Sequence, residues 1–203
     1  MGVNICLTNL GCVKTTSAAG GSSLSYFMEN LITYIIIILP LAIGLTIGAI
    51  YGKNWNDPKY KNLKKPVYNP PSYVFGIVWP ILYLAIGIIY SYALYDNKKC
   101  KPKCDTGDLF VYYKELKYWI IPMLALLFNF LYIPIFFGEN GLFNGFIIII
   151  LSLVFAVLTM IQFYLDNYNT NLKYYVILAL LPYVAWLSFA TYLSYNIYVL
   201  NTT

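Results

Sequence analysis

The chain alternates between long apolar runs and short polar segments. Each apolar run has about 20 residues or more, which is the length that an α-helix needs to cross a bilayer core. None shows the strict apolar and polar alternation of barrel strands. Because lipid offers backbone groups no partner outside a helix or a closed barrel, the pattern predicts an all-α membrane protein, a bundle of five transmembrane helices. The predicted spans are Leu31–Tyr51, Ser72–Tyr95, Tyr118–Phe137, Leu142–Leu165 and Tyr174–Val199.

The residues before the first span are mostly small or polar and end in the run Ser17-Ala18-Ala19-Gly20-Gly21-Ser22-Ser23. We expect residues 1–30 to form a disordered leader and residues 31–200 to form the membrane domain. The leader is not typical of a secretory signal, because the first apolar run is long enough to span. Five spans place the termini on opposite sides of the membrane. The lysines divide five to eight between these sides, too evenly to fix the orientation.

Composition supports the membrane interpretation. Only 10% of the 203 residues are charged and 60% are hydrophobic, whereas about a quarter of the residues in a soluble domain are charged. The surplus apolar surface must therefore face a lipid bilayer. The net charge of +5 comes from lysine alone, since the chain has no arginine. Nucleic-acid recognition favours arginine on a basic face, so we expect no nucleic-acid partner and interpret the lysines as charges that flank the membrane.

The chain contains no histidine. Histidine is the usual general base near neutral pH, the commonest metal ligand and the proximal ligand of globin-type haem. Histidine-dependent hydrolase sites, histidine-ligated zinc sites and globin-type haem sites are therefore excluded. Four cysteines fall on one side of the membrane, but a single C-x3-C pair is weak support for zinc. We expect no metal and no required cofactor. Free or palmitoylated thiols and a disulfide remain alternatives for Cys6, Cys12, Cys100 and Cys104.

Three glycines recur every four residues in the first span, namely Gly44, Gly48 and Gly52. Such a face lets another helix approach closely. It predicts either packing within the chain or a homodimer seam, and the sequence does not choose between them.

Polar and aromatic side chains inside the spans are the candidate functional residues. Asn129 lies near the middle of an apolar span, where an unpaired amide is costly. We expect it to face the bundle interior, with hydrogen bonding to a carbonyl freed by Pro122 or Pro134 as the purely structural alternative. Several aromatic rings either pack the core or line a pocket for a flat, apolar ligand. These are Trp79, Tyr83, Phe130, Phe137, Tyr183 and Trp186.

Three blocks carry a family resemblance that covers roughly residues 44–195. The first runs from Leu63 through Pro70-Pro71 to Trp79 and Tyr83, the second from Asn129 to Gly138, and the third from Leu181 to Thr191. In this order and on these helices they resemble the TspO/MBR family, the translocator or tryptophan-rich sensory proteins.

The resemblance implies a cavity between five helices that binds porphyrins, sterols and synthetic ligands, with the first loop as its lid. Tyr60 matches the lid tyrosine, and further pocket positions match Ala49, Asn129, Ala190 and Leu193. Trp79 and Trp186 match a tryptophan pair linked to light-dependent porphyrin breakdown. The resemblance also implies the mitochondrial outer membrane or another intracellular membrane.

The chain differs from the family pattern at positions that affect the predicted pocket and its ligand. Phe130 and Tyr132 replace two tryptophans, and no lysine or arginine follows Tyr195 to complete a sterol motif. We therefore predict a membrane protein that binds porphyrin-like tetrapyrroles, with sterols less supported, and has a role in their transport or regulation. The alternative is light-dependent porphyrin degradation through Trp79 and Trp186. Conventional catalysis is not expected, and spans without charged residues argue against ion-coupled transport.

Overall fold

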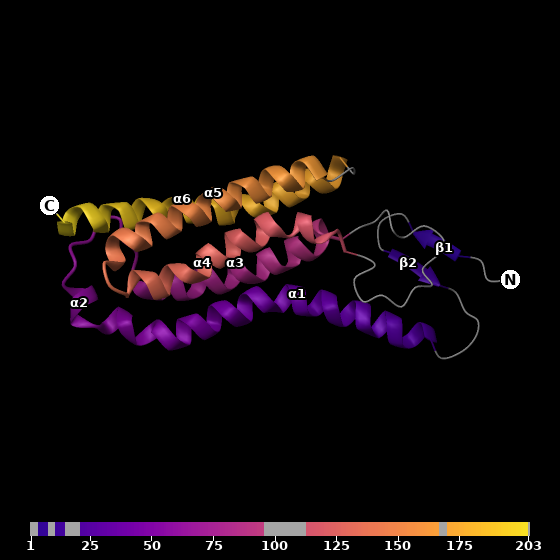
Figure 1. Cartoon of the computed structure of the whole chain (residues 1–203), viewed down its shortest axis with the longest axis horizontal. Helices are drawn as coiled ribbons and strands as arrows, with labels where there is room; N and C mark the ends of the chain where they lie inside the picture. The colour runs from indigo at the N-terminus through magenta and orange to yellow at the C-terminus, as the bar shows by residue number, and fades with distance from the viewer. Residues whose placement is uncertain (1–3, 8–10, 15–20, 96–112, 167–169, 203) are drawn as a thin grey trace.

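The computed structural model is built on five long helices that run along one axis (Figure 1). It describes residues 4–7, 11–14, 21–95, 113–166 and 170–202. The long helices are α1 (Gly21–Tyr51), α3 (Ser72–Ala93), α4 (Ile120–Phe136), α5 (Gly141–Asp166) and α6 (Thr170–Thr202). Shorter elements are the 3-10 helix η1 (Gly52–Asn56), the helix α2 (Pro58–Lys61) and the 3-10 helix η2 (Leu116–Tyr118).

Within the described residues, four helical segments are long and apolar enough to cross a membrane: Leu31–Asn56, Ser72–Ala93, Gly141–Asp166 and Lys173–Thr202. The remaining predicted span is α4, which is apolar but only 17 residues long, at the lower end of the spanning range of about 17 to 25 residues. The prediction of a helical membrane bundle is confirmed.

The predicted leader holds more secondary structure than its composition suggests. Two short strands, β1 (Asn4–Leu7) and β2 (Gly11–Lys14), pair antiparallel with Cys6 opposite Cys12. Helix α1 begins at Gly21, ten residues before the predicted start of the span. Extending a helix that the span has already nucleated costs little per residue, so hydropathy marks the span and not the helix start. Cys100 and Cys104 lie outside the described residues.

The long helices do not pack in chain order: α1 packs against α3, α3 against α6, α6 against α5, α5 against α4, and α4 against α1. At the crossing of α1 and α3, a side chain at Gly87 would overlap the backbone carbonyl of Ile37. The two helices therefore meet in backbone contact there. The centre of the bundle is filled by buried side chains such as Tyr90, Ile149, Phe163 and Leu187.

Pro122, in the first turn of α4, affects the carbonyl of Tyr118 in the preceding η2. Pro122 has no N–H, so the carbonyl of Tyr118, four residues earlier, lacks its helical donor. Gln162 on α5 donates from Nε2 to that carbonyl at 2.7 Å. The cost of the proline in the apolar region is thus offset by an amide from a neighbouring helix.

Candidate functional site

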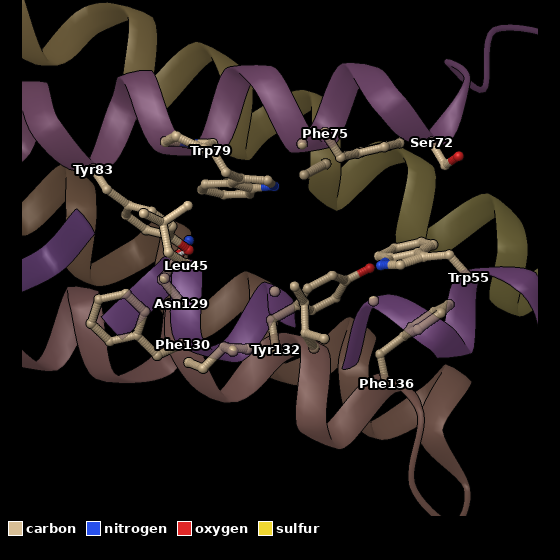
Figure 2. Close-up of a pocket in the computed structure, with 18 of the residues that line it drawn as sticks. Leu45, Trp55, Ser72, Phe75, Trp79, Tyr83, Asn129, Phe130, Tyr132 and Phe136 are labelled. Atoms are coloured by element: carbon tan, nitrogen blue, oxygen red, sulfur yellow. Dashed lines mark hydrogen bonds between the residues drawn. The ribbon is translucent and has the colours of Figure 1, made fainter. Parts of the chain in front are cut away.

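A cavity of about 380 Å³ lies between α1, α3, α4, α6 and the first loop. One face of each helix lines it, with spacings of three, four and seven or eight residues, as in Phe75, Trp79 and Tyr83 on α3. Figure 2 shows Phe75 and Trp79 facing Phe130 and Tyr132 across the cavity. The walls are therefore mainly aromatic and aliphatic.

Tyr83 and Asn129 form the polar end of this cavity (Figure 2). The hydroxyl of Tyr83 donates to Oδ1 of Asn129 at 2.7 Å. Asn129 is only 4% exposed, and its Nδ2 has no hydrogen-bond partner in the part of the chain that the structure describes. The amide therefore faces the interior as predicted. Its partner is not a proline-freed carbonyl, so the structural alternative proposed from the sequence is wrong.

Three neighbours hold the ring of Tyr83 in place. It stacks on Trp79 with ring centroids 5.5 Å apart and lies 5.3 Å from Phe130. A side chain at Gly44 would overlap the same ring. Gly44 thus serves packing within the chain, by letting a tyrosine approach the α1 backbone.

Gly48 and Gly52, the other two glycines of the four-residue repeat that begins at Gly44, have different surroundings. Gly48 and Gly52 line the cavity, and an added Cβ at either position would meet nothing within 4 Å. The absence of side chains here widens the cavity on the α1 side. A homodimer through Gly44, Gly48 and Gly52 stays a prediction.

The predicted tryptophan pair is in contact, but only one member lines the cavity. Trp79 and Trp186 meet edge to face, with centroids 6.4 Å apart. Trp186 also packs against Phe75 at 5.8 Å, and its buried Nε1 has no hydrogen-bond partner in the described structure. Trp186 on α6 therefore lies behind Phe75 and Trp79, which form the aromatic wall of the cavity.

The first loop covers the end of the cavity opposite Tyr83. We call Gly52–Pro71 the lid. Asp57 caps α2 by accepting a hydrogen bond from the backbone N–H of Lys59 at 2.8 Å, and Pro58 sits at the first helical position, which proline favours. This short helix delivers Tyr60, which lines the cavity and is 8% exposed.

Tyr60 is the centre of an aromatic cluster between the lid and the end of α4. Its ring lies 4.8 Å from Trp55, 6.2 Å from Phe136 and 5.9 Å from Phe137. Burial raises the pKa of the Tyr60 hydroxyl. The ammonium of Lys65 lies 4.0 Å from the centre of the same ring, and partial burial lowers the pKa of Lys65. The closed lid thus presents a neutral phenol under a cation.

The structure brings most of the predicted site residues to one cavity. Eight line it: Ala49, Tyr60, Trp79, Tyr83, Asn129, Phe130, Ala190 and Leu193. Three lie outside its lining: Phe137 packs beneath the lid, Trp186 stands behind the wall, and Tyr183 is buried in the core. Ligand binding by the eight stays a prediction.

Sequence reasoning missed several lining residues that a helical-face argument would have found. Phe75 lies four residues before Trp79, while Tyr132 and Phe136 follow Asn129 at three and seven residues. These spacings place them on the faces of residues already selected. Trp55 carried no such signal, because it reaches the cavity from the lid. Among the described residues, no three His, Cys, Asp or Glu side chains gather into a metal site.

Comparison with known proteins places the chain in a family. The model of the TspO/MBR family matches residues 36–200. The "Tryptophan-rich protein TspO" of Chlorobaculum tepidum is 30% identical over 171 residues, covering 82% of this chain and 97% of that protein. Its namesake from Archaeoglobus fulgidus is 30% identical, covering 81% and 94%, and the human "Translocator protein" is 28% identical, covering 77% and 83%. The chain therefore belongs to the TspO/MBR family of multi-pass membrane proteins.

Proposed function

We propose that this protein binds flat, apolar tetrapyrroles of the porphyrin type in the cavity beneath the lid, with a role in their transport or regulation. The observation that carries the proposal is the combination of aromatic walls with a buried donor, Nδ2 of Asn129, that has no hydrogen-bond partner in the described structure. A cavity of about 380 Å³ falls within the range of small-molecule sites, roughly 300 to 1,000 Å³. Buried amides of this kind fix the orientation of an otherwise apolar ligand.

The charge of the lid supports an acidic ligand over a neutral one. The lid carries five lysines and one aspartate, and Lys65 lies directly over the cavity-lining Tyr60. An excess of positive charge at the mouth of an apolar site attracts ligands with carboxylate groups. Porphyrins with propionate side chains meet this requirement, whereas sterols do not. The incomplete sterol motif at Tyr195 points the same way.

Fluorescence titration tests the proposal. Protoporphyrin IX added to purified protein in lipid nanodiscs should quench tryptophan emission saturably, and Phe130→Ala should weaken binding about tenfold or more. Phe128→Ala is the matched control, because Phe128 is on the same helix but stacks on Phe155, 5.4 Å away and outside the cavity lining. Non-saturable quenching, or equal weakening by both variants, would contradict the proposal.

Light-dependent porphyrin degradation is the second candidate function. The edge contact between Trp79 and Trp186 favours it, because one ring lines the cavity and the other lies directly behind it. Loss of the Soret band under illumination should be faster in the wild type than in Trp79→Phe. Equal decay rates in the two proteins would rule out a part for this pair.

Transport without ion coupling is compatible with the same cavity. The predicted spans contain no Asp, Glu, Lys or Arg, so no proton or ion relay supports a pump. Porphyrin flux into liposomes would distinguish carriage from binding alone.

A further inference from the structure

One side chain at the end of α6 holds the lid by both backbone groups of a single residue. The backbone N–H of Lys64 donates to Oδ1 of Asn201 at 2.9 Å, and Nδ2 of Asn201 donates to the carbonyl of Lys64 at 2.9 Å. The two residues are 137 positions apart in the sequence. Figure 1 shows α2 and the end of α6 at the same end of the bundle.

Asn201 is itself fixed on its helix. Its Nδ2 also donates to the carbonyl of Ile197, four residues earlier, at 2.7 Å. The side chain is therefore anchored to α6 before it meets the lid, and less rotamer freedom is lost when the two bonds to Lys64 form.

The same helical turn contacts the lid through apolar packing. Ile197 lines the cavity, is 4% exposed and belongs to one buried cluster with Tyr60 and Phe136. Leu63, the residue before Lys64, packs against this cluster. The end of α6 thus grips the lid at two adjacent points, one polar at Asn201 and one apolar at Ile197.

The chemistry of the asparagine side chain suits this contact. A primary amide offers a donor and an acceptor side by side, so it pairs with the N–H and C=O of one residue as a neighbouring strand would. Aspartate keeps the acceptor and loses the donor, while alanine loses both. Graded loss of the contact can therefore be produced at one position.

We propose that Asn201 is a positioning residue that latches the lid over the cavity and sets the rate at which ligand is exchanged. The inference rests on the proposed function, because an exchange rate requires a ligand in the cavity, whereas the contact between Asn201 and Lys64 does not. Opening of the lid requires both bonds to Lys64 to break, whereas the walls of the cavity are untouched. Loss of the latch therefore accelerates entry and release together and changes equilibrium affinity less.

The test uses the full-length protein in lipid nanodiscs, with Asn201→Ala and Asn201→Asp as variants. Asn196→Ala is the matched control, because the Asn196 amide donates to the carbonyl of Tyr192 four residues earlier at 2.7 Å, an exposed bond within the helix. Hydrogen exchange at the Lys64 amide is measured without ligand, and the release of protoporphyrin IX is followed by stopped-flow displacement.

Asn201→Ala should raise both the Lys64 exchange rate and the porphyrin release rate by about 5- to 30-fold, as expected for two lost hydrogen bonds. Asn201→Asp should protect Lys64 more than alanine does, and Asn196→Ala should match the wild type. Equal exchange and release in Asn201→Ala and Asn196→Ala would overturn the latch. If the wild type shows no saturable binding, the proposed function and the exchange role fall together, and altered Lys64 exchange would then show a purely structural contact.

Discussion

The hydroxyl of Tyr83 on α3 donates to Oδ1 of Asn129 on α4 at 2.7 Å, inside a cavity that both residues line. This bond ties together two walls of the cavity, and the Nδ2 of Asn129 has no hydrogen-bond partner among the described residues. Under the proposed function, a change in either residue alters both the packing of the bundle and the recognition of the ligand.

Removal of the Tyr83 hydroxyl should therefore destabilise the protein. Tyr83→Phe leaves the Asn129 acceptor buried and unpaired, which costs about 1 to 2 kcal/mol by the range observed for buried groups and membrane hydrogen bonds. Thermal unfolding in a fixed detergent measures the effect. Tyr92→Phe on the same helix is the control, because Tyr92 is 60% exposed. Equal melting temperatures for both variants would show that the bond contributes nothing.

Alanine at two glycines of α1 should have opposite effects. Gly44→Ala places a methyl group into the ring of Tyr83, so we expect lower stability and weaker porphyrin binding. At Gly48 a Cβ meets nothing within 4 Å, so Gly48→Ala should be neutral or stabilise by up to about 1 kcal/mol through helix propensity. Melting temperatures that move in the same direction would contradict this assignment of Gly44 to packing.

Gln162 should contribute more to stability while proline occupies position 122 than when alanine does. Gln162→Ala leaves the Tyr118 carbonyl without the donor that Gln162 supplies, for an expected loss of about 1 kcal/mol. Pro122→Ala restores an N–H to the helix and should make the loss of Gln162 smaller. A double-mutant cycle of unfolding free energies measures this coupling. Strictly additive effects would show that the amide does not compensate for the proline.

The lid should open in alkali through Tyr60. Burial raises the pKa of this hydroxyl above its ordinary value of about 10, so the closed lid favours the neutral phenol. The contribution of the neutral Tyr60 phenol to closure is fully present below the ordinary pKa of about 10. It is lost as pH rises through the higher pKa that Tyr60 has in the closed lid. Porphyrin release should therefore accelerate above about pH 10 in the wild type, by more than in Tyr60→Phe.

Lys65 acts in the opposite direction. Partial burial lowers its pKa, so its contribution to closure grows as the ammonium loses its proton. Comparison of the pH dependence of porphyrin release in Tyr60→Phe and in Lys65→Met separates the contributions of the phenol and the ammonium. Release rates that rise equally with pH in the wild type and in Tyr60→Phe would exclude the phenol as the titrating group.

Hydropathy predicted the membrane bundle because the cost of unpaired backbone groups in lipid leaves few alternatives. The cost of an unpaired amide likewise placed Asn129 in the interior, but it could not name the partner. That partner is a tyrosine on another helix, while Gln162 satisfies the proline-freed carbonyl. Both outcomes depend on helix rotation and register, which no single segment encodes.

The lid was harder to predict than the walls. Residues on the cavity faces of α3 and α4 follow helical spacing, so Phe75, Tyr132 and Phe136 were open to prediction from Trp79 and Asn129. Asn201 meets Lys64 across 137 positions, and neither residue stands in a periodic pattern. For Trp186 the sequence left core packing and pocket lining open, and its side chain packs behind Phe75 and Trp79.

The central claim is that the open space beside α1 is occupied by a tetrapyrrole. Gly48→Leu fills that space from a position where an added Cβ meets no neighbouring atom within 4 Å, and Ala42→Leu introduces the same side chain at an exposed position outside the cavity lining. The most direct measurement is the equilibrium dissociation constant for protoporphyrin IX in the wild type and both variants. The account predicts at least about tenfold weaker binding for Gly48→Leu, with a melting temperature that is not lowered, and wild-type affinity for Ala42→Leu. Wild-type affinity in Gly48→Leu would contradict it.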